Sequence, residues 1–167
     1  MTTAWADAPW EERALLNPGF LGLLVQRLAA GHVQETSRPL PFVLAFVGAT
    51  AVLHGPTRRS LPTNIRSSLA AWLGDHPEVL VRFPERASRL VPAVREGVLF
   101  GARVGGLRVV AGGGIEPLPL KKRWQSELLG LPVNDVHEAA GSALFVGRWF
   151  GRSSSATTIL TLWGVKP

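Results

Sequence analysis

The chain has 167 residues, a length typical of one domain. With 46% hydrophobic and 18% charged residues, it can bury a core and is not compositionally disordered. The 18 Lys and Arg residues exceed the 12 Asp and Glu residues, and the formal net charge of +6 favours an acidic or anionic partner. Cysteine is absent, which excludes disulfides, zinc–thiolate sites, iron–sulfur clusters and thiol nucleophiles.

Residues 1–16 are predicted to be a flexible lead-in with two tryptophans, Trp5 and Trp10, that either mark a protein interface or pack back onto the domain. No basic stretch with a long apolar run follows the start of the chain, so we expect no secretory signal and a cytoplasmic location. The least polar stretch, residues 39–53, would cover only about 22 Å as a helix, against ~30 Å of hydrocarbon in a bilayer. It is predicted to be a buried helix, with no contact to a membrane.

Asn17-Pro18 predicts the start of the first helix, because the asparagine oxygen can cap it and proline suits its first position. Apolar residues at three- and four-residue spacing continue this helix to about Gly31, with Gln26 and Arg27 expected on the outward face. Pro41 opens a second helix, and its uniformly apolar composition places it in the core.

The next segment, residues 54–62, is predicted to be a loop with two adjacent arginines. A third helix is expected over residues 64–73. A fourth helical stretch covers residues 77–104, with a break at Pro84 or Pro92.

Two short apolar pieces, residues 107–110 and 115–118, flank a run of glycines and predict a β-hairpin. A helix followed directly by a hairpin is found at the end of a winged-helix unit. Many other α+β folds contain the same pair, so the hairpin leaves the fold family open.

The last long helix is expected to begin at Asn134, a good capping residue. One of its faces carries only small residues at four-residue spacing, here called the small-residue row: Ala139, Ala143, Gly147 and Gly151. Such a row lets another backbone approach closely, so Gly147→Leu is expected to overpack the contact and cost about 1–3 kcal/mol.

A short last helix is predicted after Ser155. Taken together, these elements predict one predominantly helical α+β domain over residues 17–167, with five to six helices and one small β-hairpin.

The chemistry-bearing residues do not converge on a reaction. The four histidines (His32, His54, His76 and His137) are scattered, whereas a metal site needs three or four converging ligands, so all four are expected at the surface or at helix caps. The glycines at 112–114 lie between two strands and lack the helix that a phosphate-binding loop requires. We therefore expect no enzyme, no catalytic residue, no metal and no cofactor.

The Lys and Arg residues form clusters and are the most informative signal in the sequence. Each cluster is either a solvated face or a contact to phosphate or to an acidic protein, and none of them argues for direct reading of bases. The candidate partner- or DNA-contacting residues are Arg58, Arg59, Arg66, Arg82, Arg86, Arg89, Lys121, Lys122, Arg123, Trp124, Arg148 and Arg152.

Three stretches resemble one family. Residues 15–62, with an "NP" start, an "RPLPF" centre and an "LH..TR..LP" end, are similar to the N-terminal half of the middle component of bacterial three-component ABC systems. Residues 91–105 (VPAVREGVLFGARVG) resemble its central segment, and residues 145–167, with "GRWF", resemble its C-terminal end. Their ordered combination is more specific than any single stretch.

The resemblance implies a non-catalytic adaptor. Its partners would be a large ABC-type ATPase, similar to the SMC-like ATPases of chromosome maintenance and repair, and an effector that is often a nuclease. Such systems resemble anti-phage and anti-plasmid defence, with Lamassu-type systems as close relatives. The resemblance implies that contact with DNA is indirect, through the ATPase.

The alternative is a stand-alone winged-helix DNA-binding regulator, with the hairpin at 107–118 as its wing. A recognition helix usually presents several polar side chains to DNA. The helix over residues 91–104 offers only Arg95, Glu96 and Arg103, which favours burial or a protein interface.

Overall fold

A computed structural model describes residues 16–123, 126 and 134–166. The predicted lead-in, apart from residue 16, lies outside these described residues, and so do Trp5, Trp10 and Trp124. The described part of the chain contains seven α-helices and one small antiparallel sheet, which confirms the helical α+β prediction.

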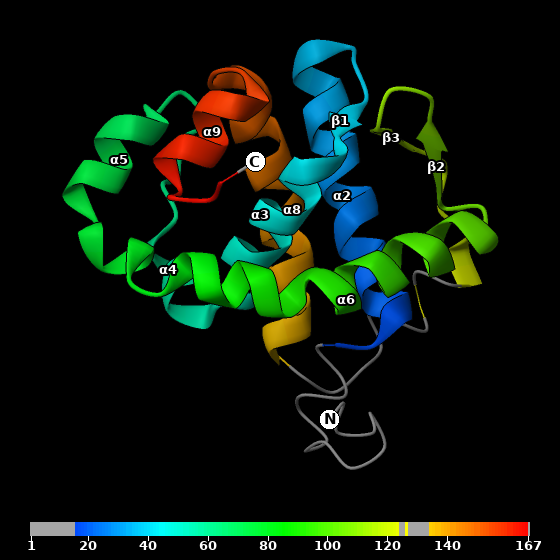
Figure 1. Ribbon diagram of the computed structural model, residues 1–167. Helices are drawn as coiled ribbons and strands as arrows, with labels where there is room; N and C mark the ends of the chain where they lie inside the picture. The colour runs from blue at the N-terminus through cyan, green and yellow to red at the C-terminus, as the bar shows by residue number, and fades with distance from the viewer. Residues whose placement is uncertain (1–15, 124–125, 127–133, 167) are drawn as a thin grey trace.

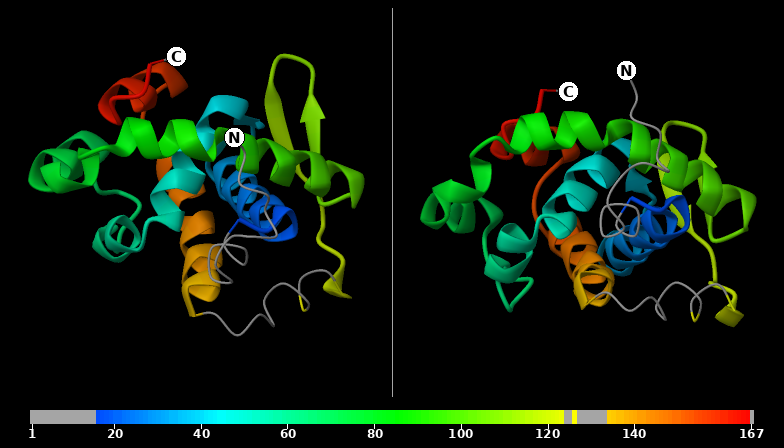
Figure 2. Two further views of the ribbon diagram at one scale, coloured as in Figure 1. Left: turned by 60° about the horizontal axis from the view of Figure 1, so that its bottom comes forward. Right: turned by 90° about the horizontal axis from the view of Figure 1, so that it is seen from below.

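The core forms where three long helices meet. Helix α2 (Pro18–Thr36) packs along α8 (Asn134–Arg152), and α6 (Phe83–Arg103) crosses in front of them (Figures 1 and 2). Helix α3 (Phe42–Leu53) packs against both α6 and α8. The sheet lies at one end of this arrangement and the shorter helix α5 (Leu69–Asp75) at the other (Figure 1).

Helix α2 begins where predicted, because the backbone N–H groups of Gly19 and Phe20 donate to Asn17 Oδ1 at 2.8 and 3.3 Å. It continues past the expected end to Thr36. The outward position predicted for Gln26 is wrong. Its side chain is buried and donates from Nε2 to the carbonyl oxygen of Leu118 at 3.0 Å, since the chain folds back over α2 there.

Helix α3 confirms the predicted core helix, with Pro41 just before its first residue and most of its side chains buried. The residues before it form a strand that the sequence did not indicate, β1 (Leu40–Pro41). Two residues are too few to show the alternating pattern by which strands are recognised.

The predicted loop at 54–62 is wrong, because most of it forms α4 (Gly55–Ser60). His54 caps this helix, with the backbone N–H of Thr57 donating to His54 Nδ1 at 3.4 Å. Histidine is an unusual capping residue, so the sequence contains none of the common caps (Ser, Thr, Asp or Asn) that would predict a helix start at this position.

Helix α5 starts at Leu69, later than the start predicted at residue 64. Asn64 accepts a hydrogen bond from the backbone N–H of Arg66 at 2.9 Å and forms a local turn. Ser68 then caps the helix by accepting from the N–H of Ala71 at 3.3 Å. The sequence favours Thr63 as the cap of this helix, but Ser68 takes that role and the helix begins later.

The stretch over 77–104 divides into a short 3-10 helix, η2 (Pro77–Leu80), and α6. The break predicted at Pro84 or Pro92 lies instead at Arg82, whose φ is +55°. Pro84 occupies the first turn of α6, and Pro92 lies within the helix on its exposed side. Burial of the opposite face against α2 and α3 offsets the hydrogen bond that Pro92 cannot donate.

The predicted hairpin is confirmed. Strand β2 (Leu107–Val110) has the predicted bounds, and its partner β3 (Gly114–Pro117) begins and ends one residue earlier than predicted. Gly112 and Gly113 form its turn with φ of +89° and +80°, which glycine adopts without strain. Because β3 also pairs with β1, the hairpin is part of a three-stranded sheet of order β1-β3-β2.

The C-terminal elements also agree with the sequence. Helix α8 begins at Asn134, although the side chain of this residue lies outside the described part. Helix α9 (Ala156–Leu162) is capped by Ser155, which accepts from the N–H of Thr158 at 3.3 Å. Within the described residues, every helix is too short or too polar to cross a membrane.

Candidate partner-binding surfaces

The small-residue row of α8 lies against another backbone, as the sequence indicated, and that backbone is α2. A β-carbon placed on Gly147 would lie 2.0 Å from the carbonyl oxygen of Leu28, and one on Gly31 would lie 2.2 Å from that of Leu144. The two backbones therefore touch directly. This contact fixes the position of the arginines at the end of α8.

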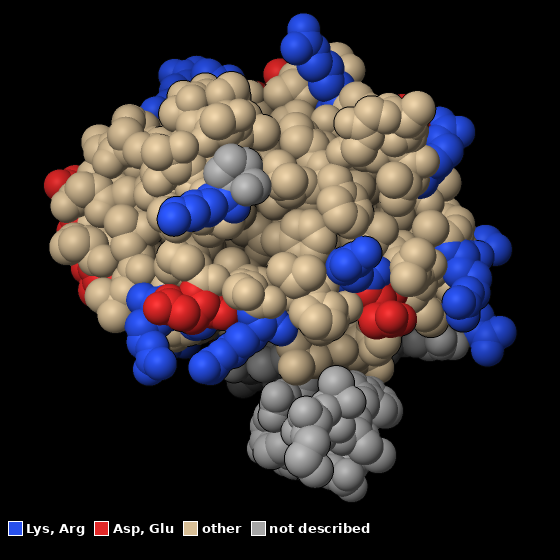
Figure 3. Space-filling model, viewed as in Figure 1, with Lys and Arg blue, Asp and Glu red and all other residues tan. Residues whose placement is uncertain are grey.

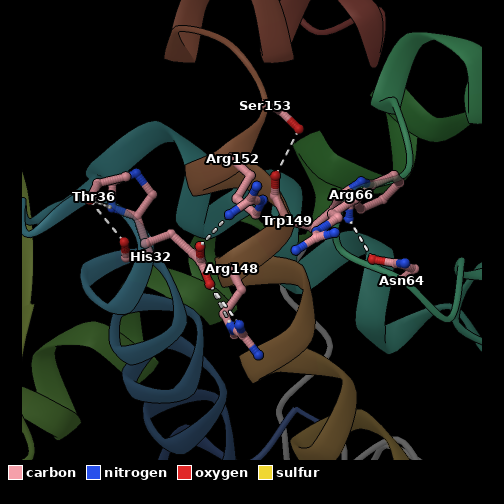
Figure 4. Close-up of polar contacts among 9 residues, drawn as sticks. His32, Thr36, Asn64, Arg66, Arg148, Trp149, Arg152 and Ser153 are labelled. Atoms are coloured by element: carbon pink, nitrogen blue, oxygen red, sulfur yellow. Dashed lines mark hydrogen bonds and ion pairs between the residues drawn. The ribbon is translucent and has the colours of Figure 1, made fainter.

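Arg148 and Arg152 form an ion-pair cluster with Glu35 of α2 (Figure 4). Arg148 Nε donates to Glu35 Oε1 at 2.8 Å, and Arg152 Nη1 donates to Glu35 Oε2 at 3.1 Å. The hydrogen bonds from the two guanidinium groups lower the pKa of the Glu35 carboxyl. Both arginines thus hold the fold together, although each keeps part of its side chain exposed.

Glu35→Gln is expected to reduce the loss of stability that acidification causes. A carboxyl whose folded pKa is lowered contributes stability above its unfolded pKa, about 4.3, and loses it as the pH falls through the folded value. The melting temperatures of the wild type and of Glu35→Gln should therefore differ at pH 7 and converge on acidification below about pH 4.3. Glu96→Gln, at an exposed position of α6, is the matched control. A constant difference at every pH would contradict the prediction.

Arg58 lies inside the fold, with only 5% of the residue exposed. Its Nη1 donates to the carbonyl oxygen of Val52 at 2.7 Å, and its Nη2 donates to Glu138 Oε2 at 3.2 Å. The neighbouring Arg59 is exposed. The two adjacent arginines therefore differ in role, since the turn of α4 directs one inward and the other to solvent.

The spacing of Arg82, Arg86 and Arg89, four and three residues apart, predicts a basic stripe along one helical face, and the structure interrupts this stripe at its centre. Arg86 is half-buried and donates to the carbonyl oxygens of Val81 at 2.7 Å and Val79 at 3.1 Å. Burial lowers the pKa of its guanidinium, which stays charged at neutral pH. Arg86 closes the junction between η2 and α6 and leaves Arg82 and Arg89 as exposed charges.

The other predicted contact residues lie at the surface or outside the described part. Trp124 is not described. The exposed members of the predicted set are Arg59, Arg66, Arg82, Arg89, Lys121, Lys122, Arg123 and Arg152.

The histidines differ from the prediction at one position. His32 is buried at 7% exposure, neither a surface nor a capping residue, and its Nδ1 lies 3.1 Å from the carbonyl oxygen of Arg38. Burial lowers the pKa of His32. The pKa of the capping His54 is also lowered, by burial and by the charges of nearby arginines. Across the described residues, no group of three potential metal ligands comes together.

An apolar groove of about 500 Å³ opens between α3, α6 and the C-terminal segment. Lys166 is the only charged residue among the described residues that line it. In the same view as Figure 1, the area above α6 is largely uncharged, and most charges lie along α6 and at the edges (Figure 3). The apolar side chains of the groove are Val43, Phe46, Val47, Val91, Leu160 and Val165.

An open apolar groove on a charge-poor face is typical of proteins that bind other proteins. Residues 5–167 match the family model for Middle Component 3 of ABC-three component (ABC-3C) systems, and the chain belongs to this family. The family resemblance seen in the sequence is thereby confirmed, and a middle component of such a system has protein partners. No curated protein and no solved structure matches the chain.

Proposed function

We propose that this chain is a non-catalytic adaptor that connects an SMC-like ABC ATPase to an effector, such as a nuclease, in a bacterial anti-phage or anti-plasmid defence complex. The observation that carries the proposal is the family match, which covers nearly the whole chain. The motifs typical of the family are spread over the fold: at the start of α2, over β1 and the start of α3, over α4, and within α6 and α8.

The apolar groove is where we place a partner. Its walls are α3, α6 and the C-terminal segment that includes Leu160 of α9, and an apolar groove between helices suits the apolar face of a further helix. Val43 on its rim is 41% exposed, an unusual exposure for valine in a core helix. The occupant that fits is an amphipathic helix of another component of the same system.

The direct test is to co-express the tagged chain with its operon neighbours and to weigh the purified assembly by native mass spectrometry. A stable complex with an ATPase and an effector is the expected result. If the chain purified without either neighbour and shifted duplex DNA with steep salt dependence, the proposal would be overturned in favour of a winged-helix regulator.

The groove is tested by Val43→Asp in the same co-expression. Aspartate should be tolerated in the first turn of α3, where the helix dipole favours negative charge, so the melting temperature should change little. The partner should be lost from the purified assembly. Leu99→Asp, at a position of α6 that is 59% exposed and does not line the groove, is the matched control. Retention of the partner by Val43→Asp would place the interface elsewhere.

Reversal of the run Lys121, Lys122 and Arg123 to glutamate should weaken association with a partner or with DNA. All three residues are exposed, so the melting temperature should stay nearly unchanged. Thermal unfolding and the native mass measurement check the two parts of this prediction. A variant that unfolds would show instead that the run is structural.

A further inference from the structure

A second pocket, of about 460 Å³, lies between the segment that leads into α5 and the end of α8. It differs from the apolar groove because arginine and serine side chains line it and no acidic residue does so within the described part of the chain. Its volume falls in the range of small-molecule sites. The polar residues that line it are Arg66, Ser67, Ser68, Arg152, Ser153 and Ser154.

One tryptophan joins the two walls of this pocket through a hydrogen bond to Ser67, and a second bond holds Ser153 at the end of its own helix. Trp149 Nε1 donates to the carbonyl oxygen of Ser67 at 2.7 Å, and the hydroxyl of Ser153 donates to the carbonyl oxygen of Trp149 at 2.7 Å. Trp149 is fully buried. The positions of the arginines on either side are therefore set by the core and not by a loose loop.

The arginines come from distant parts of the chain and meet at the pocket. Arg66 extends from its segment toward Arg152 (Figure 4), and its backbone N–H is held by Asn64 at 2.9 Å. The guanidinium of Arg66 has no hydrogen bond or ion pair to any described residue. Arg152 uses Nη1 for Glu35, and 44% of its side chain remains exposed.

The described residues that line the pocket include two arginines and no carboxylate. Among the described residues, Arg148 and Arg152 share the single carboxylate of Glu35, and Arg66 adds a further positive charge to the pocket. Two cations that face each other repel, and an anion between them relieves the repulsion. Guanidinium groups bind phosphate oxygens in a bidentate manner, and serine hydroxyls can donate to the same oxygens.

We propose that the Arg66–Arg152 pocket binds a phosphate group, carried by a nucleotide or by the backbone of a nucleic acid. The site is independent of the adaptor function, because it uses neither the apolar groove nor a second component. Arg66 is the residue whose loss tests phosphate binding most directly, because Arg152 also pairs with Glu35.

The test uses the full chain and compares Arg66→Gln with Arg59→Gln, an exposed arginine that does not line the pocket and whose loss changes the net charge equally. The probes are AMP, measured by calorimetry, and fluorescent single-stranded and duplex oligonucleotides, measured by anisotropy over a salt series. Arg66→Gln should weaken binding about tenfold, as expected for loss of one charged hydrogen-bonding group, and should reduce the salt slope for oligonucleotides by about one. Arg59→Gln should leave the affinity close to that of the wild type.

Binding of AMP alone would assign the phosphate to a nucleotide, and binding of oligonucleotides would assign it to a nucleic acid; both outcomes support the pocket. Equal losses for the two variants would show a general effect of net charge and would overturn the proposal. So would the absence of binding by the wild type to every probe. Because the guanidinium of Arg66 makes no hydrogen bond or ion pair within the described part of the chain, thermal unfolding should show the same melting temperature for Arg66→Gln and the wild type.

Discussion

Gly147→Ala is expected to lower the free energy of unfolding by about 3 kcal/mol, at the upper end of the range for overpacking. The added β-carbon would lie 2.0 Å from the carbonyl oxygen of Leu28 and 2.8 Å from its carbonyl carbon. These are backbone atoms of a buried helix, so no side chain can rotate away to make room. Helices α2 and α8 would have to separate, which would loosen the centre of the core.

The matched control is Gly141→Ala in the same helix. Apart from its chain neighbours and the backbone of its own helix, no described atom lies within 4 Å of a β-carbon at this position, so the alanine meets no obstacle there. It should stabilise the protein by up to about 1 kcal/mol, because alanine has the higher helix propensity. Urea denaturation of both variants gives the comparison. If Gly147→Ala were as stable as Gly141→Ala, α2 and α8 could not be in the contact described.

The sequence could predict the small-residue row but not its partner. Four small residues at four-residue spacing in one helix form a pattern that is visible locally. Gly31 on α2 completes the contact, yet a single glycine in a helix gives no comparable signal. The same holds where α2 crosses α6, since a β-carbon on Gly22 would lie 2.8 Å from the carbonyl oxygen of Gly97. A close helix crossing depends on two segments that are far apart in the sequence. A local sequence pattern describes only one of them and does not identify the other.

Helix starts were predictable where one capping residue had no competitor. Asn17 and Ser155 cap the helices expected of them. The start of α5 is predicted too early because Thr63 and Ser68 both suit a cap, and the choice depends on where Trp72 and Leu73 must pack. The break before α6 lies at Arg82 with φ of +55°, a conformation that arginine rarely adopts and that its sequence does not indicate.

The arginine clusters show the same limit at the level of function. Spacing along the chain groups Arg58 with Arg59 and Arg148 with Arg152, whereas the fold buries Arg58 and pairs the other two with Glu35. Residues that the sequence assigns to different clusters, Arg66 and Arg152, line one pocket. The sequence shows which residues are charged, but the tertiary structure determines which groups each charged residue contacts.

Arg58→Ala is expected to destabilise the protein by about 3 kcal/mol. The substitution leaves the carbonyl oxygen of Val52 without its charged donor in a fully buried residue, at a cost of about 1–3 kcal/mol, and it also opens a cavity. The ion pair itself contributes less, because the side chain of Glu138 is 54% exposed and can be solvated. Chemical denaturation gives the free energy of each variant.

Three companion variants separate the causes. Arg59→Ala removes the adjacent exposed arginine and should change stability by less than about 0.5 kcal/mol, the usual effect of a surface substitution. Glu138→Gln should also cost less than about 1 kcal/mol. Arg58→Met keeps much of the buried side-chain volume without the donors, so it should fall between the wild type and Arg58→Ala. Equal effects of Arg58→Ala and Arg59→Ala would mean that the guanidinium of Arg58 is not buried, and both arginines could then contact a partner.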